Sequence, residues 1–275
     1  MRTRALATLV LILVVASLAA AQRGGRRGGG FGQRSYSIAT ADDFDGSFQF
    51  CRVVFRQASN GDGGNWSVDF PRADENLSIR ISELTKTPVG FDADATPKHL
   101  LVTLREPAAL SHCAFIMMTE VGSLYLDDQE AANLRDYLLK GGFLWADDFW
   151  GSRAWDLFEA QIRRVLPSGP YPIVDLPLEH PIFHAQMAVQ KVPQIPSINF
   201  WGGPGGPTSE RGSDSAVPHA RAILDEHKRV MVFITHNTDV GDSFEREGDS
   251  RAYFLEFSVP GYALGVNVIL YALTH

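Results

Sequence analysis

Two adjacent acidic residues, Asp147 and Asp148, directly follow the apolar run FLWA and are the residues best placed for chemistry. A carboxylate at the end of a buried strand can act as a nucleophile or a general base, or it can bind a metal ion. Because adjacent strand residues point to opposite sides, we expect only one of the two to face a cleft. In the alternative interpretation both serve the turn, and one accepts backbone N–H bonds near the start of the following helix.

Aromatic residues beside these acids predict a ligand pocket. Trp145 and Trp150 flank the pair and can form the wall for an apolar or sugar ring, although large aromatic residues more often belong to the core. Trp66 and Asp69 lie in the run WSVDFPRADENL at 66–77 and are included in the predicted pocket.

Two further segments contain residues with the types and spacing of metal ligands. His180 and His184 lie four residues apart, which on a helix is a spacing that zinc sites use. Asp239 belongs to the run HNTDVGDSFE at 236–245, whose oxygen atoms suit calcium or magnesium. Both segments also fit a structural role, because Asx-rich loops usually satisfy their own backbone. No cofactor is strongly implied, and a divalent metal bound by His180, His184 and Asp239 is one hypothesis.

Motifs of several common enzyme classes are missing from the sequence. It has no G-x-S-x-G elbow, no phosphate-binding loop and no dinucleotide-binding fingerprint. Serine hydrolase, kinase and dehydrogenase functions are therefore disfavoured.

The elements that must position these residues alternate between short apolar runs and amphipathic stretches. Strands are expected at 48–55, 99–104, 114–119, 143–147 and 171–177, and helices at 73–85, 128–140, about 153–166 and 261–274. The pattern predicts an α/β fold, in which a mostly parallel sheet has helices on both faces and a β-hairpin lies near the C-terminus. Ser152 is expected to cap the helix that follows Asp148. Ligands bind such sheets at the carboxyl ends of the strands, where Asp147 and Asp148 lie.

The chain is expected to be exported as a single domain. Residues 1–21 have the positive start, the apolar run and the small residues before a cut that identify a signal peptide, with cleavage after Ala21. Residues 22–35 are rich in Gly and Arg, which predicts a flexible linker, and 36–275 form the α/β domain. We therefore expect a periplasmic or secreted protein with no membrane span after cleavage.

The charge of the domain limits its partners. The full chain carries −7, but the six arginines of residues 1–34 face no acidic residue there, so residues 35–275 carry −13. A domain this acidic repels anionic surfaces, which disfavours nucleic acid and favours a cell-envelope protein, peptide or glycan. The sequence has two cysteines, Cys51 and Cys113. An oxidising compartment permits a disulfide, but each lies beside an apolar run, so buried free thiols are favoured slightly.

Several of these runs resemble the domain-of-unknown-function family 4159. They are FQFCRVVF, the W-x-x-D-F-P run at 66–77, LRDYLLKGGFLWADDFWG at 134–151, HPIFH at 180–184, HNTDVGDSFE and the closing GVNVILYALTH. The resemblance implies a flavodoxin-like sheet similar to class I glutamine amidotransferases, and it implies no activity. In that wider group a nucleophilic cysteine follows the strand after the Gly-Gly pair, where this chain has Asp148. Thiol-dependent amidotransferase chemistry is therefore disfavoured.

Two functions remain open at this point. The first is a non-catalytic binding module of the cell envelope, which fits the missing nucleophile and the acidic domain. The second is a hydrolase, metal-assisted in one version, that uses Asp147 or Asp148 with His184 or His236. Convergence of Asp148, His184 and Asp239 on one point would favour the hydrolase.

Overall fold

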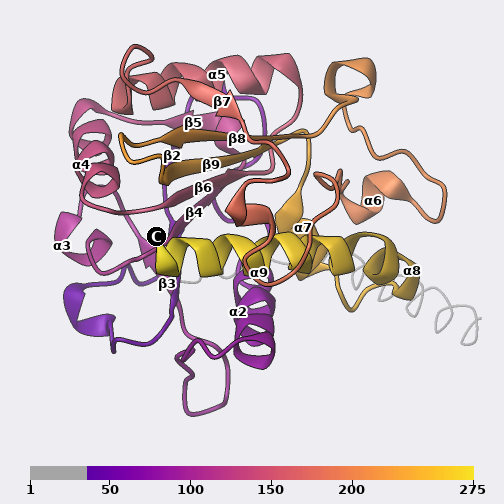
Figure 1. Ribbon diagram of the computed structural model, residues 1–275, viewed down its shortest axis with the longest axis horizontal. Coiled ribbons are helices and arrows are strands. Elements are labelled where there is room, and N and C mark those ends of the chain that lie inside the picture. Colours follow the sequence, from indigo (N-terminus) through magenta and orange to yellow (C-terminus); the bar gives the residue numbers. More distant parts are fainter. Residues whose placement is uncertain (1–35) are drawn as a thin grey trace, which may run out of the picture. The chain divides into compact units, whose positions relative to one another are not determined.

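The computed structural model describes residues 36–275, so the predicted signal peptide and the whole of the predicted linker lie outside the described residues. From Ile38 to His275 the chain forms one unit. Its main sheet has seven strands in the order β3-β1-β4-β6-β9-β8-β7 (Figure 1). Their bounds are β1 Phe50–Val53, β3 His99–Val102, β4 Ile116–Thr119, β6 Leu144–Asp147, β7 Ile173–Asp175, β8 His219–Leu224 and β9 Val230–His236. A separate antiparallel pair joins β2 (Arg56–Gln57) to β5 (Leu124–Tyr125).

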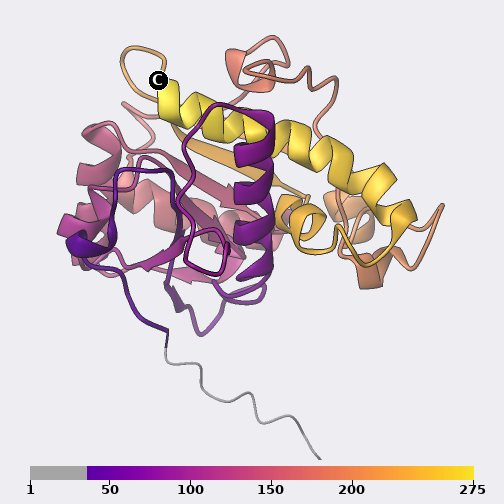
Figure 2. The ribbon, with the colours of Figure 1, turned by 90° about the horizontal axis from the view of Figure 1, so that it is seen from below.

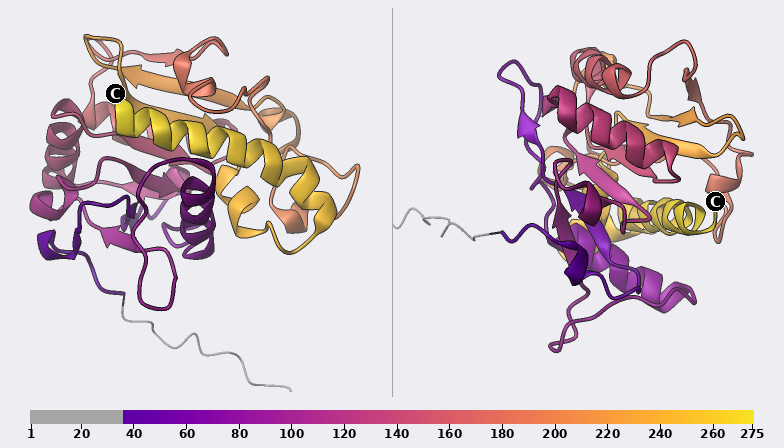
Figure 3. Two further views of the ribbon diagram at one scale, coloured as in Figure 1. Left: turned by 60° about the horizontal axis from the view of Figure 1, so that its bottom comes forward. Right: turned by 90° about the vertical axis from the view of Figure 1, so that its left-hand side faces the viewer.

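Five strands of the main sheet, β1, β3, β4, β6 and β9, run parallel, whereas β8 and β7 are antiparallel to their neighbours. The predicted mostly parallel α/β sheet and the β8–β9 hairpin are thus confirmed, and the left view of Figure 3 shows the hairpin in orange. Taken in chain order, the parallel strands are arranged 2-1-3-4-5, the order of doubly wound flavodoxin-like sheets. The order reverses between β1 and β4, and ligands of such sheets bind at that point, beyond the carboxyl ends of the strands.

Helices cover both faces of the sheet. Two of them, α4 (Asp128–Leu139) and α5 (Gly151–Val165), pack with Leu144 and Ala146 on one face. On the other face α2 (Arg72–Leu84), α7 (Val240–Glu245) and α9 (Val259–Thr274) pack with Phe143 and Trp145, and α2 and α9 lie side by side (Figure 2). The remaining α-helices are short: α3 Pro107–Leu110, α6 Ile198–Trp201 and α8 Arg251–Tyr253. The 3₁₀ turns are η1 Ala41–Asp43, η2 Val121–Ser123, η3 Pro181–Phe183 and η4 Gly212–Ser215, and η5 Phe254–Ser258 is a π-helix. Strand β6 is therefore buried on both faces, as its continuous apolar run predicts.

Side chains fix where the helices next to β6 begin. Helix α4 has a capping box, in which Asp127 accepts from the backbone of Glu130 and the Glu130 side chain accepts in return. The expected cap of α5 by Ser152 is wrong, because α5 already begins at Gly151. The first turn of α5 is instead capped by Asp214, which is distant in the sequence and whose Oδ2 accepts from the backbone nitrogen of Ser152 at 2.9 Å. A cap 62 residues away cannot be read from local sequence.

The C-terminal helical stretch passes a simple test for a membrane span. Arg251–Thr274 is long and apolar enough to cross a bilayer by length and composition, but 61% of its most apolar window is buried inside the domain. Its residues Leu264, Val266 and Val268 are fully buried in the core that also contains Trp145. Such burial is typical of the core helix of a water-soluble domain.

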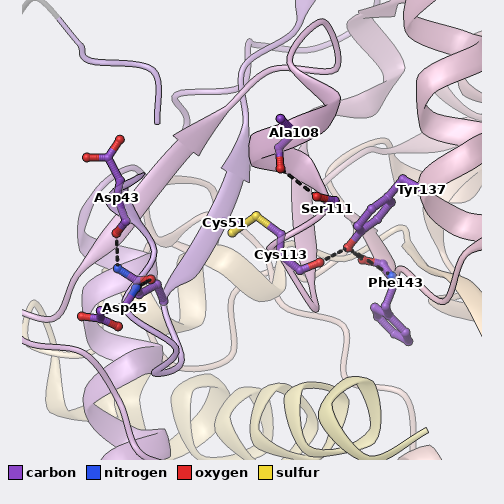
Figure 4. The surroundings of a disulfide bond; sticks show 9 residues. Asp43, Asp45, Cys51, Ala108, Ser111, Cys113, Tyr137 and Phe143 are labelled. Atoms are coloured by element: carbon purple, nitrogen blue, oxygen red, sulfur yellow. Dashed lines mark hydrogen bonds between the residues drawn. A yellow bond between two sulfur atoms is a disulfide. The ribbon is translucent and has the colours of Figure 1, made fainter. Parts of the chain in front are cut away.

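Cys51 and Cys113 form a disulfide (Figure 4). The expectation of free thiols is therefore wrong. Cys51 lies in β1 and Cys113 lies just before β4, and these two strands are neighbours in the sheet. Their adjacency comes from the strand order, which the sequence pattern does not fix. The Tyr137 hydroxyl donates to the carbonyl oxygen of Cys113 at 2.9 Å and so ties α4 to the same segment.

Removal of this disulfide should destabilise the domain. The bond closes a loop with a sequence separation of 62, for which chain entropy gives about 4 kcal/mol. We expect the variant Cys51→Ala with Cys113→Ala to lose about 2–5 kcal/mol of unfolding free energy in urea titrations. The wild-type protein in reductant should behave like the variant, and equal stability of all three samples would contradict a structural role.

Candidate functional site

Four non-glycine residues with left-handed backbone conformation lie in loops at the carboxyl edge of the sheet. Glu120, Asp148 and Asn237 directly follow β4, β6 and β9, with φ angles of 56°, 56° and 62°. Asp69, with φ of 64°, lies in the connection from β1 to α2. Such conformations are uncommon outside glycine and gather at active sites and ligand-binding turns. They therefore direct attention to this edge.

A cavity of about 380 Å³ opens at the same edge. Its lining includes eight acidic side chains: Asp62, Asp69, Glu120, Asp148, Glu210, Asp239, Asp242 and Glu245. It includes two basic ones, Arg211 and Arg246, which pair with Asp62 and with Asp242 and Glu245. The carboxylates thus exceed the cations of the lining by six, which makes this a strongly acidic pocket that attracts cations.

Asp69 is the central residue of this pocket. Its side chain is buried, with 6% of the residue exposed, and its Oδ2 has no hydrogen-bond partner among the described residues. Gly241 makes room for it, because a Cβ at that position would lie 2.4 Å from Asp69 Oδ2. A buried carboxylate oxygen without a donor is costly, and a water molecule or a bound ion would remove that cost.

Two sets of carboxylates surround Asp69. In the first, ligand atoms of Asp69, Asp148 and Asp239 all lie within 4.8 Å of one another, and in the second the same holds for Asp69, Asp242 and Glu245. These residues come from the β1–α2 loop, the β6–α5 turn and the two ends of α7. The distances are those at which several oxygens can bind one cation.

Of the two adjacent acids, Asp148 faces the cavity and Asp147 does not. The Oδ1 of Asp147 accepts from the Thr235 hydroxyl, and its Oδ2 accepts from the backbone nitrogen of Gly241 at 3.0 Å. Asp147 therefore links the start of α7 to β9. Burial raises the pKa of Asp147 to about 7. Burial also raises the pKa of Asp148 well above its usual range, and the nearby charge of Glu120 adds to this effect. The indole nitrogen of Trp150 donates to Asp148 at 3.3 Å.

Asp239 and Asp242 are set by the first turn of α7. Asp239 caps this helix, because its Oδ1 accepts from the backbone nitrogen of Asp242 at 2.7 Å. The side chain of Asp242 is held in turn, because its Oδ2 accepts from the backbone nitrogen of Ile198 at 2.9 Å. Burial raises the pKa of Asp239 well above its usual range, and the charge of Asp148 raises it further. These carboxylates are thus fixed by backbone donors.

A buried arginine lies beneath the pocket and positions the loop that carries Asp69. Arg52 is fully buried in β1 and forms an ion pair with Asp74 of α2. Its Nη1 donates to the Thr119 hydroxyl at 3.0 Å and to the carbonyl oxygens of Trp66 and Val68 at 3.4 Å. Arg52 therefore links β1, β4, α2 and the 66–69 loop.

Two of the four residues predicted to line a ligand pocket do line the acidic cavity, and two do not. Asp69 and Trp150 line the acidic cavity. Trp145 is fully buried, and its indole nitrogen donates to Thr235 at 2.8 Å, so it belongs to the core. Trp66 is half-buried against Phe70 and contributes its carbonyl oxygen to Arg52.

The structure does not bring the predicted metal ligands His180, His184 and Asp239 together. The segment between the two histidines, which only an α-helix would place on one face, is a 3₁₀ turn, η3 (Pro181–Phe183). His180 Nδ1 accepts from the backbone of Ile182, and His184 Nε2 contacts the Leu178 carbonyl oxygen at 2.6 Å. Among residues 36–275, no group of three ligands around one point includes a histidine. Asp239 instead lies beside Asp69 and Asp148.

His236 also lies away from these ligand groups. It is buried, its Nε2 is 3.1 Å from the carbonyl oxygen of Gly151, and its ring packs against Phe149. Burial lowers its pKa to about 4. The histidine-based versions of the hydrolase hypothesis therefore have no geometric support among the described residues.

Sequence reasoning missed three acids of the cavity, Asp62, Glu120 and Glu210. Glu120 directly follows the predicted strand 114–119, so the rule that drew attention to Asp148 could have identified it. Glu210 lies between α6 and the 3₁₀ turn at 212–215, in a stretch rich in Pro and Gly, and it accepts from the backbone nitrogen of Ser197 at 2.7 Å. No local sequence pattern predicts that Glu210 reaches the cavity. Burial raises the pKa of Glu120 to about 7 and also raises that of Glu210.

The buried acids predict an unusual pH dependence of stability. Because the pKa values of Asp147 and Glu120 are raised to about 7, the folded protein holds protons that the unfolded chain releases. This stability is fully present below pH 4 and is lost as the pH rises through 7. The lowered pKa of His236 acts in the opposite direction, but the acids outnumber it. In EDTA, urea titrations should therefore give a lower unfolding free energy at pH 8 than at pH 5.5, by about 2 kcal/mol or more. A more stable protein at pH 8 would contradict this burial of the acids.

Comparison with known proteins gives a family but no activity. The family described as "Domain of unknown function (DUF4159)" matches residues 50–273, which include every strand of the main sheet and all the carboxylates of the cavity. A search of curated proteins finds no match.

Proposed function

The chain belongs to the domain-of-unknown-function family DUF4159, and we propose that this domain binds a divalent cation in the acidic cavity, through Asp69 with its neighbouring carboxylates. The single observation that carries the proposal is the buried Oδ2 of Asp69, which has no hydrogen-bond donor among the described residues and belongs to a side chain that is part of both carboxylate groups. A hard cation would satisfy this oxygen and offset the excess negative charge at the same time.

The donor set favours calcium, magnesium or manganese over zinc. All the side chains in the two ligand groups are carboxylates, and hard cations prefer oxygen ligands. Zinc sites more often contain histidine or cysteine. The expected cofactor is therefore a calcium- or magnesium-like ion, and the histidine pair has no part in it.

The cellular setting that we propose is the periplasm or the exterior of the cell. The signal-peptide pattern of residues 1–21 supports export, and the disulfide between Cys51 and Cys113 supports an oxidising compartment. In this setting the binding module expected from the sequence becomes a cation-dependent one. A cation at the cavity would bind oxygen-rich groups of an envelope protein, peptide or glycan.

Titration calorimetry of the purified chain tests the proposal. The protein is first dialysed against EDTA and then against metal-free buffer at pH 7.5, and CaCl₂, MgCl₂ and MnCl₂ are each added. We expect saturable binding of at least one of these ions, and unchanged binding in Asp136→Asn, which removes an exposed acid that pairs with Lys140 outside the cavity. The absence of saturable binding up to about 10 mM, well above the Kd of extracellular calcium modules, would refute the proposal.

A hydrolase that uses the bound cation is a second candidate function. The left-handed turn at Asp148 between β6 and α5 favours it, because hydrolases place a nucleophile at a strained strand-to-helix turn. Glu120 and Glu210 also line the cavity but belong to neither ligand group, so they are available to accept a proton from water. Cation-dependent hydrolysis of an ester or amide, lost in Asp148→Asn, would support this function over simple binding.

A further inference from the structure

The two ligand groups of the cavity share one residue. Asp69 belongs to both, whereas Asp148 and Asp239 belong to the first and Asp242 and Glu245 to the second. A carboxylate has two oxygens and can bind one cation with each of them. Asp69 is therefore the one residue of the two groups whose carboxylate is within reach of both.

On the basis of the cation-binding function, we propose that the cavity holds two divalent cations bridged by the carboxylate of Asp69. The first cation is bound by Asp69, Asp148 and Asp239, and the second by Asp69, Asp242 and Glu245. Carboxylate-bridged pairs of divalent ions in proteins lie about 3.5–4 Å apart.

Helix α7 determines the separation of the two positions. Asp239 precedes this helix, whereas Asp242 lies in its first turn and Glu245 is its last residue, so the first group takes a ligand from the N-cap and the second takes its two from within the helix. Asp69 lies between them, where the missing Cβ of Gly241 leaves room for its Oδ2. The same Cβ would lie 3.5 Å from Asp239 Oδ1, so Gly241 borders both the bridge and a ligand of the first position.

The charges of the pocket also favour two cations over one. When all eight carboxylates of the lining are ionised, they face two arginines and leave six negative charges. Arg52 beneath the pocket does not alter this balance, because Asp74 forms a buried ion pair with it. One divalent cation would offset two of the six charges, and a pair would offset four.

Manganese serves as the probe, because two bridged Mn²⁺ ions couple magnetically and a single Mn²⁺ gives an isolated six-line spectrum. The purified chain in metal-free buffer is dialysed against MnCl₂ for stoichiometry and measured by electron paramagnetic resonance. We expect two Mn²⁺ per chain with the spectrum of a coupled pair. One Mn²⁺ per chain would overturn the bridge while leaving the cation-binding function intact, and no bound Mn²⁺ would overturn both.

Two variants separate the positions. Asp148→Asn removes a ligand of the first group and Glu245→Gln one of the second, and both keep the shape of the side chain. Each variant should bind one Mn²⁺ with an uncoupled spectrum, and Asp136→Asn should match the wild type. Circular dichroism and the urea midpoint confirm that each variant is folded. A folded variant that keeps two coupled ions would overturn the assignment of its ligand.

Discussion

The variant Asp69→Asn should bind Ca²⁺, Mg²⁺ and Mn²⁺ at least 100-fold more weakly than the wild type. Asp69 is the one residue shared by both ligand groups, and an amide removes its charge and one of its ligand oxygens without changing its shape. The cation-free variant should be at least as stable as the wild type, because burial raises the pKa of Asp69 well above its usual range and a neutral amide avoids that cost. Titration calorimetry and urea unfolding in EDTA measure the two effects.

The combination of the two effects makes this prediction specific. A variant that merely misfolds would lose both binding and stability, whereas the ligand role requires lost binding in a protein that unfolds at the same or higher urea concentration. Asp136→Asn provides the matched control, since it makes the same chemical change at an exposed site. Unchanged affinity in Asp69→Asn would remove Asp69 from the site.

The variant Arg52→Met should lose about 3–5 kcal/mol of unfolding free energy. Arg52 and Asp74 are both fully buried, so loss of the guanidinium leaves an uncompensated carboxylate in the core. The hydrogen bonds to Thr119 and to the carbonyl oxygens of Trp66 and Val68 are lost as well. Urea titration at pH 7 in the presence of EDTA gives the free energy directly.

The double variant Arg52→Met with Asp74→Leu tests the cause. If the cost comes from an unpaired buried charge, the double variant should recover most of the lost stability. It should still bind cations more weakly than the wild type, because the loop that carries Asp69 has lost the donor that holds it. A double variant as unstable as Arg52→Met would contradict the charge explanation.

The fold could be largely predicted because its signals are local. The run FLWA predicts a strand that is buried on both faces, which is β6. The helical spacing of Leu77 and Ile81 predicts the face of α2 that packs into the core. The strand order could not be read in this way. The apolar runs beside Cys51 and Cys113 favoured free thiols, whereas the proximity of the two residues depends on β1 and β4 being neighbours.

The site could be predicted only in part, since it is assembled from loops far apart in the sequence. Asp148 was recognised because it follows a strand that local pattern identifies, and the same argument applies to Glu120. Asp69 was recognised only through the W-x-x-D-F-P run, without a chemical task. The spacing of His180 and His184 suggested a metal site that the structure does not assemble. An i,i+4 spacing brings two side chains to one face only on an α-helix, and this segment forms a 3₁₀ turn.

The most direct test of the cation site is a crystal structure of the protein soaked in MnCl₂, with anomalous difference density measured at the manganese absorption edge. We expect a peak within about 2.0–2.6 Å of an Asp69 carboxylate oxygen and of oxygens from Asp148 and Asp239 or from Asp242 and Glu245. A map with manganese only at exposed acids outside the cavity, and none beside Asp69, would contradict it.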